Sequence, residues 1–241
     1  MLEQFGDGQW WVDLVRIMGI DVLLSGDNAV VIALASRSLP EPQRKWAIIG
    51  GASAAIVLRV LFATVIVWLL QIPYLRLVGG VLLIYIGVKL VVPESGGHGD
   101  GIQSRANLFG AIQTILVADA VMSLDNVVAI AAAARGRVSL IVLGLIISIP
   151  LIIYSSQVVL RVINRFSILV VLGGGLLGWI AGEIIVSDPA AQARLPLDAH
   201  LQEQIAKPLL ALLVMAIGMV LARRARTREH DMGNLVSEER V

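Results

Sequence analysis

The chain has 241 residues, of which 57% are hydrophobic and only 15% are charged, with a formal net charge of +1 and no cysteine. A soluble domain carries about 25% charged residues, so this composition excludes an ordinary soluble protein. The balanced charge offers no basic surface for nucleic acid. Without cysteine, the chain has no disulfide, no thiolate metal site and no thiol redox chemistry.

Apolar runs long enough to span a bilayer, which takes about 20 residues, recur along the whole chain. They predict seven helices, near 11–36, 47–70, 74–92, 106–134, 138–160, 167–186 and 208–222. If the N-terminus lies outside, the flanks and short loops on the inner side hold eleven Lys and Arg, and those on the outer side hold five. Because positive flanks stay in the cytoplasm, we expect the N-terminus outside and the C-terminus in the cytoplasm.

A 17-residue segment occurs twice in the chain. Residues 21–37 and 119–135 are identical at nine positions without a gap, including two Asp, one Ser, one Asn and one Arg. Shared apolar composition does not explain these polar matches, because the whole chain has only five Asn. The segment is therefore interpreted as part of an internal repeat.

A second match, between 79–86 and 173–180, extends the repeat to three helices. Because three is an odd number, the second copy enters the membrane from the opposite face, as in many transporters with a midplane binding site. We therefore predict an all-α integral membrane protein of about seven transmembrane helices, built from two inverted three-helix repeats and one C-terminal helix. The expected segments are a first repeat over 8–92, a Gly-rich linker over 93–105, a second repeat over 106–186, a polar loop over 187–207, a seventh helix over 208–224 and a cytoplasmic tail over 225–241.

Four aspartates, Asp21, Asp27, Asp119 and Asp125, lie inside the predicted membrane helices. Each charge at a helix centre costs roughly 2.5–3.5 kcal/mol, so the four together cost on the order of 10–14 kcal/mol if all are ionised. A cost of this size favours a functional site. The alternative is that they form polar contacts between helices or pair with Arg59.

The spacing of the motif places its polar residues on two faces. At about 100° per residue, one face of each helix holds an Asp, a Ser and an Asn. These are Asp21, Ser25 and Asn28 in the first copy and Asp119, Ser123 and Asn126 in the second. The other two aspartates, Asp27 and Asp125, fall about 120° away, so they line a different face unless the helix is unwound locally.

Unwinding is favoured in the first copy, where Ser25 precedes Gly26. Glycine weakens a helix, and the freed backbone carbonyls of a broken membrane helix can bind a cation. Leu124 replaces this glycine in the second copy, so the symmetry is expected to break there.

The motif side chains offer oxygen ligands, which hard divalent cations such as Mg²⁺, Ca²⁺ and Mn²⁺ prefer. Zinc and copper prefer His or Cys, and the three His lie outside the predicted helices. Burial and mutual repulsion disfavour four simultaneous negative charges, so we expect protons on the empty site and proton-coupled metal transport. The candidate metal ligands are Asp21, Asp27, Asn28, Asp119, Asp125 and Asn126, supported by Ser25, Ser123, Arg59 and Glu183.

Two of the supporting residues have narrower expected roles. Arg59 is expected to offset the charge of one aspartate. Glu183 near a helix end is a candidate carboxylate on the access path, unless it only extends to the membrane interface.

The two motifs, over 21–29 and 119–127, resemble those of the TerC family of bacterial membrane proteins, and the likeness extends from about residue 8 to 224. The family has about seven spans and belongs to a wider group that includes lysine exporters. Several of its members are associated with manganese export, and others were named for tellurium resistance. The resemblance therefore implies Mn²⁺ export across the bacterial inner membrane through the motif residues, with Mn²⁺ as transported ion and no resident cofactor.

Other function classes stay open. A small-solute exporter of the amino-acid type would need an apolar pocket beside a counter-charge such as Arg59. An intramembrane aspartyl protease would need a single Asp dyad, whereas the motif supplies four carboxylates; a structural membrane partner is a weaker alternative. We expect a transporter rather than an enzyme, with a divalent metal ion, protons and the lipid bilayer as partners, no nucleic acid, and a homo-oligomer as an open possibility.

Overall fold

The computed structural model describes residues 8–69, 72–92, 102–134, 137–192 and 198–238, and these ranges contain helices and short connections but no strand. The helices are α1 (Gly8–Leu24), α2 (Gly26–Ser36), α3 (Glu41–Leu69), α4 (Leu75–Val91), α5 (Ile102–Ala134), α6 (Val138–Arg165), α7 (Ile168–Val186), α8 (Pro189–Gln192) and α9 (Ala199–Glu238). Most of the expected Gly-rich linker over 93–105 lies outside the described residues.

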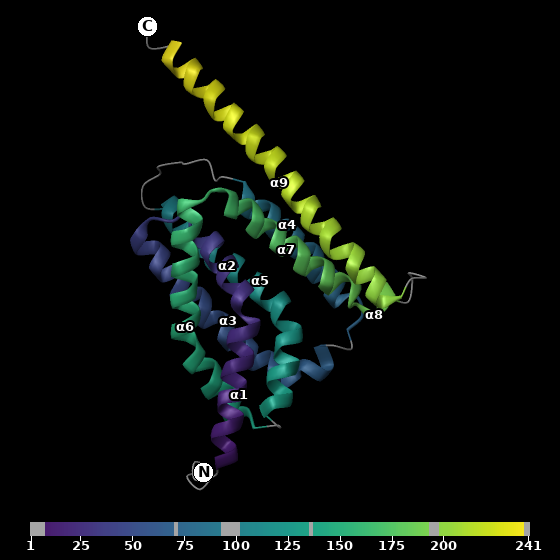
Figure 1. The fold of residues 1–241 in the computed structure, drawn as a ribbon. Helices are drawn as coiled ribbons and strands as arrows, with labels where there is room; N and C mark the ends of the chain where they lie inside the picture. Colours follow the sequence, from purple (N-terminus) through teal and green to yellow (C-terminus); the bar gives the residue numbers. More distant parts are fainter. Residues whose placement is uncertain (1–7, 70–71, 93–101, 135–136, 193–197, 239–241) are drawn as a thin grey trace.

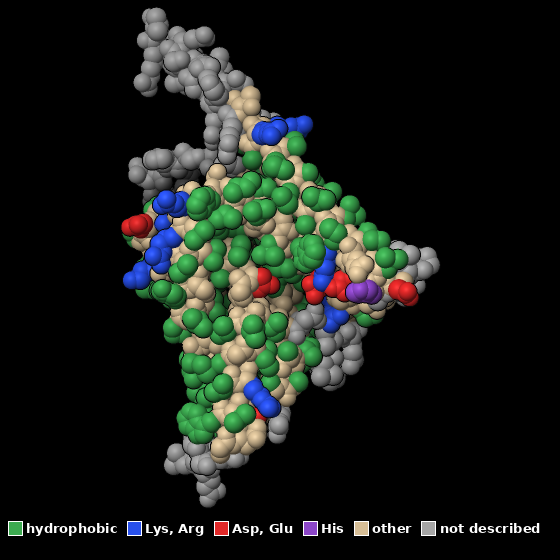
Figure 2. All heavy atoms as spheres, viewed as in Figure 1, with side chains coloured by type: hydrophobic (Ala, Val, Ile, Leu, Met, Phe, Trp, Pro, Cys, Tyr) green, Lys and Arg blue, Asp and Glu red, His purple; other side chains and the backbone are tan. Residues whose placement is uncertain are grey.

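Five of the described helices, α3, α5, α6, α7 and α9, are long and apolar enough to cross a membrane, and α1 with α2 forms a sixth candidate. Helix α4 has 17 residues and is shorter than these. Hydrophobic side chains cover most of the face in Figure 2, and most charged side chains lie near its margins. The predicted all-α membrane class is confirmed, whereas the number of seven spans and the orientation in the membrane stay predictions.

The first membrane segment is broken within its motif. Helix α1 ends at Leu24, and α2 begins at Gly26 with its axis bent by 51°. In the second copy α5 runs without a break through the equivalent position, Leu124. The sequence left open whether the helices unwind at the motif, and the structure shows a break at Ser25 in the first copy alone. The cause is local, because glycine weakens a helix that leucine stabilises.

The helices pack in two groups. Helices α4, α7 and α9 run side by side, and α1, α2, α3, α5 and α6 form the rest of the bundle (Figure 1). In the second group α1 and α2 pack against α6, while α5 packs against α3. The first segment of each copy thus packs against the second helix of the other copy. Two inverted repeats would produce this reciprocal pairing, which supports that prediction.

Glycines allow α4 and α7 to cross with their backbones in contact. A Cβ atom added at Gly80 would lie 3.0 Å from the carbonyl oxygen of Ala181, and one added at Gly174 would lie 3.2 Å from that of Gly87. The two contacts are related by a shift of 94 residues, which is also the offset of the second sequence match. The crossing is therefore antiparallel and nearly symmetric.

The last helix is longer than the sequence predicts. The expected helix over 208–224 is part of α9, which begins at Ala199 and continues to Glu238. The polar loop expected over 187–207 is accordingly wrong in extent, since it contains α8 and the first turns of α9. Glu203 and Lys207 form an ion pair four residues apart, which stabilises a helix in this polar segment.

The close packing of α7 against α9 predicts that Gly178→Ala destabilises the protein. The added Cβ would lie 2.4 Å from the backbone oxygen of Leu210, so the helices must separate, at a cost of about 1–3 kcal/mol. Thermal unfolding of the purified protein in detergent measures this. The matched control is Gly19→Ala in α1, where no atom of another described segment lies within 4 Å of the new Cβ. Equal unfolding temperatures for the two variants would contradict this packing.

Candidate functional site

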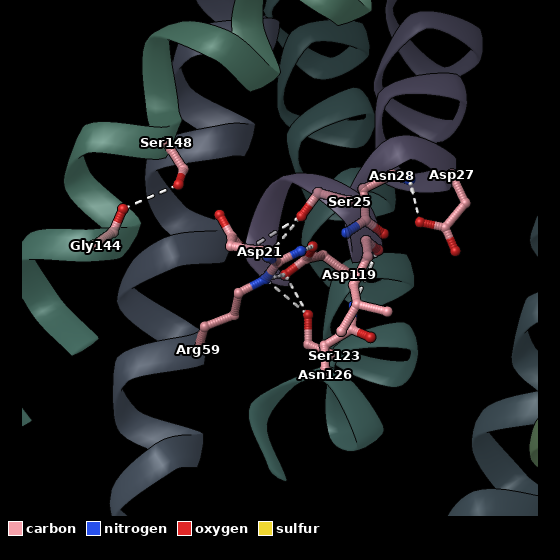
Figure 3. Close-up of polar contacts among 11 residues, drawn as sticks. Asp21, Ser25, Asp27, Asn28, Arg59, Asp119, Ser123, Asn126, Gly144 and Ser148 are labelled. Carbon is pink, nitrogen blue, oxygen red and sulfur yellow. Dashed lines mark hydrogen bonds and ion pairs between the residues drawn. The ribbon is translucent and has the colours of Figure 1, made fainter. Parts of the chain in front are cut away.

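A polar cluster from three helices lies inside the bundle. Asp21 comes from the end of α1 and Ser25 from the break, Arg59 from α3, and Asp119 and Ser123 from α5 (Figure 3). Each of the five residues is at most 6% exposed. The structure brings these five residues together, and the pairing with Arg59 that the sequence analysis gave as the structural alternative is observed. Their role in metal binding stays a prediction.

The Arg59 guanidinium holds the cluster together with all three of its nitrogens. Its Nη1 donates to Asp21 Oδ1 over 2.5 Å, and its Nη2 donates to Asp119 Oδ1 over 2.5 Å. Its Nε donates to Asp119 Oδ2 over 3.1 Å. The hydroxyls of Ser25 and Ser123 lie 3.0 and 2.9 Å from Nη1 and Nε. The rigid fork of arginine suits such multiple contacts, which a lysine ammonium would not reproduce.

The two copies of the motif contribute equivalent contacts to this cluster. The Ser25 hydroxyl donates to Asp21 Oδ1 over 3.3 Å, and the Ser123 hydroxyl donates to Asp119 Oδ2 over 3.0 Å. The sequence predicts that Arg59 offsets one carboxylate, whereas it contacts both. The reason is that the packing of α1 and α5 around α3 brings the two equivalent carboxylates together at one residue of α3. We call Asp21 and Asp119 the carboxylate pair.

Several buried polar atoms next to the carboxylate pair have no hydrogen-bond partner among the described residues. They are Asp21 Oδ2 and both amide atoms of Asn28. Asn28 and Asp119 also line a small cavity of about 10 Å³, together with Val31, Ile32 and Ile115. That volume fits about one water molecule or one small ion. Since buried polar groups normally have partners, the amide atoms of Asn28, which lines the cavity, are suited to a ligand of that size.

The other two motif residues with described side chains lie apart from Arg59. Asp27 points away from the cluster in Figure 3, and its Oδ1 accepts a hydrogen bond of 2.8 Å from the backbone nitrogen of Asn28. It lies in the first turn of α2, where a helix dipole stabilises a carboxylate. Asn126 donates to the backbone oxygen of Leu24 over 3.2 Å and so satisfies a carbonyl in the last turn of α1.

Asp125 lies within α5, and its side chain is outside the described residues. Among the side chains that are described, no three His, Asp or Glu residues converge on a point that could hold a metal ion. In this conformation the carboxylate pair is bound to Arg59 instead.

Glu183, the predicted access-path carboxylate, lies outside the cluster. Its Oε2 is 3.1 Å from Lys207 Nζ of α9, and its side chain is 51% exposed. It is held there because α7 packs against α9 rather than against the break in the first segment. Whether it lies on an access path stays a prediction.

A second buried ion pair was missed by the sequence analysis. Asp13 in α1 is fully buried, accepts a hydrogen bond of 2.9 Å from Gln9, and forms an ion pair with Arg137 before α6. The predicted topology contains the signal for this pair, because it places the start of the first span and the loop after the fourth span on one side of the membrane. The pair connects the start of α1 to α6.

Comparison with known proteins identifies a family. The chain matches the Integral membrane protein TerC family over residues 6–230. It is 44% identical to "Uncharacterized membrane protein YjbE" of Bacillus subtilis over 177 residues, which are 73% of this chain and 80% of that relative. It is 24% identical to "UPF0053 inner membrane protein YoaE" of Escherichia coli, covering 71% of this chain and 36% of that relative. No solved structure gives a significant match.

The Arg59 contacts predict that Asp119→Asn destabilises the protein far more than Asp27→Asn. Removing one partner of a buried ion pair costs about 3–5 kcal/mol, because the remaining charge loses its compensation. Asp27 contacts the backbone of α2, so its replacement should cost at most about 1 kcal/mol. Chemical unfolding of both variants in detergent measures the difference. Similar losses of stability in the two variants would show that the ion pair of Asp119 with Arg59 does not stabilise the fold.

Proposed function

The chain belongs to the TerC family of integral membrane proteins, and from this we propose that it is a transporter that exports a divalent metal ion. Mn²⁺ is the ion we propose, with protons moving in the opposite direction and the bacterial inner membrane as its location. The single observation that supports the proposal most strongly is the buried meeting of the two motif copies at the carboxylate pair.

The chemistry of the cluster fits a hard cation. Its acceptors are carboxylate, hydroxyl and amide oxygens, and no His or Cys side chain belongs to the described cluster. Mn²⁺ and Mg²⁺ take such oxygen ligands, whereas zinc and copper favour nitrogen and sulfur. The cavity between Asn28 and Asp119 has room for one small ion without its hydration shell. The side-chain amide oxygen of Asn28, which has no hydrogen-bond partner among the described residues, would supply a further ligand.

The break in the first segment adds features that transporters use. Broken membrane helices place their ends near the midplane, where backbone carbonyls coordinate cations. Here the break at Ser25 separates Asp21, near the end of α1, from Asp27, in the first turn of α2. Movement of α2 relative to α1 would change the position of Asn28 against Asp119. We propose that this bend lets the cargo site open to one side of the membrane at a time.

The charge balance supports coupling to protons. The motifs contribute four carboxylates, and Arg59 compensates one negative charge. A membrane interior disfavours the uncompensated charges that would remain. We propose that protons neutralise part of the site when no metal is bound and leave when the metal enters, because metal ligands must be deprotonated.

The competing function classes find less support in the described residues. An amino-acid exporter needs a pocket beside Arg59 that holds a whole solute, and the cavity beside the carboxylate pair is about 10 Å³. An aspartyl protease needs two carboxylates that share a proton around a catalytic water. Here the guanidinium lies between the two carboxylates, so our proposal includes no enzymatic activity.

Metal flux into proteoliposomes tests the proposal directly. We expect the wild type to move Mn²⁺ down a gradient with an opposite movement of protons, recorded by a pH dye inside the vesicles. Asp27→Asn and Asp125→Asn should each lower the Mn²⁺ flux by roughly tenfold or more, as the loss of a metal-site group typically does. Mg²⁺ and Ca²⁺ gradients in the same vesicles measure selectivity.

The matched control is Asp198→Asn, which makes the same chemical change at an exposed position just before α9. It should transport Mn²⁺ at the wild-type rate. If the wild type moves no divalent metal under any gradient, the transport proposal is wrong. If it moves metal without proton movement, the antiport part alone is wrong.

A further inference from the structure

We infer that Arg59 is a tethered cation that occupies the carboxylate pair in the metal-free protein and must leave it before the metal can bind there. The inference rests on the proposed metal transport and assigns a role to a residue that is not itself a metal ligand. It follows from three observations: the saturation of Asp119, the position of the cavity, and the burial of the charges.

Asp119 offers no free chelating edge while Arg59 is in place. Its Oδ1 and Oδ2 both accept hydrogen bonds from the guanidinium, over 2.5 and 3.1 Å. Such a two-point contact uses the directions in which a carboxylate chelates a metal. The Asp21 oxygen nearest to Arg59 is engaged as well, which leaves Asp21 Oδ2 without a partner among the described atoms. The carboxylate pair is therefore bound like a ligand set that already holds a cation.

The cavity would place an incoming metal against the same carboxylate that Arg59 binds. Asn28 and Asp119 line it, and Asp119 is the residue that Arg59 binds with two nitrogens. A divalent ion there and Arg59 would both contact one carboxylate. Repulsion between like charges is strong in surroundings of low polarity, and Arg59 is only 2% exposed. Occupancy by the metal and occupancy by the guanidinium are thus alternatives.

A carrier gains from such an arrangement. Without any cation, two buried carboxylates would repel each other inside the membrane and separate α1 from α5. With Arg59 between them, the empty protein stays assembled. The metal has to displace Arg59, which weakens metal binding enough for release on the other side, since transport requires binding that can be reversed.

The rival explanation is a permanent clamp. In that case Arg59 would hold α1, α3 and α5 together at every stage, and the metal would bind only around Asp27 and Asn28. The two explanations predict opposite changes in Mn²⁺ affinity when Arg59 is removed. Competition predicts tighter metal binding when Arg59 is removed, and a permanent clamp predicts equal or weaker binding.

Calorimetric titration of the purified full-length protein with MnCl₂ separates them. If Arg59 competes, Arg59→Gln should bind Mn²⁺ about tenfold tighter than the wild type. In the wild type only the molecules whose guanidinium has left the carboxylate pair can bind the metal, whereas in the variant all of them can. The matched control is Arg137→Gln, which removes an arginine from another buried carboxylate, Asp13. It should bind Mn²⁺ with the wild-type affinity.

Thermal unfolding gives a second test, in which the rise in unfolding temperature caused by Mn²⁺ is measured. A purely structural role of Arg59 would not increase this rise. Metal-free Arg59→Gln should unfold at a lower temperature than the wild type, and saturating Mn²⁺ should raise its unfolding temperature by more than it raises that of the wild type. Arg137→Gln should also unfold earlier but show the wild-type response to Mn²⁺. A metal response of Arg59→Gln equal to that of Arg137→Gln overturns the inference.

Arg59→Lys keeps the test decisive if Arg59→Gln does not fold. Lysine retains the charge but lacks the fork, so it competes less well, and Mn²⁺ binding should tighten by a few-fold. Unchanged or weaker binding in both variants, with normal binding by the wild type, overturns the inference and leaves the transport proposal intact. Absence of Mn²⁺ binding and flux in the wild type overturns the transport proposal itself.

Discussion

Charge compensation inside a low-polarity bundle is the constraint on which the rest of this structure depends. Asp21, Asp119 and Arg59 are all almost fully buried, and none could stay ionised there alone. Their ion pairs require α1, α3 and α5 to meet at one level of the membrane. The reciprocal packing of the two copies and the antiparallel crossing of α4 and α7 are arrangements that allow this meeting.

The two copies of the motif have diverged around that shared centre. Both supply an Asp and a Ser to Arg59, but only the first is broken, at Ser25. As a result their asparagines differ. Asn126 donates to the last turn of α1, while Asn28 faces the small cavity with its amide atoms unpartnered among the described residues. Under the proposed transport function, the break would let the first copy move against the second during alternating access.

Much of this could be predicted from the sequence, because intramembrane charges and hydropathy are strong local signals. The motif aspartates were found from their spacing and charge. The break at Ser25 was left open, although Gly26 in the first copy and Leu124 in the second explain it once it is seen. The double role of Arg59 was not found, because nothing in its own segment shows that both carboxylates reach it. The start of α9 was misplaced because Pro208 and the polar residues before it look like a loop. The Asp13–Arg137 ion pair was missed because finding it means asking which charged residues the predicted topology places on the same side of the membrane.

Anomalous X-ray scattering at the manganese edge, from crystals of the protein grown with Mn²⁺, would locate the ion independently of transport activity. We expect one strong peak beside Asp119 and Asn28, with the Arg59 guanidinium withdrawn from the carboxylate pair. The contradicting result is ordered protein with Arg59 still bound to Asp21 and Asp119 and manganese absent from the bundle, or present only at exposed carboxylates such as Glu183.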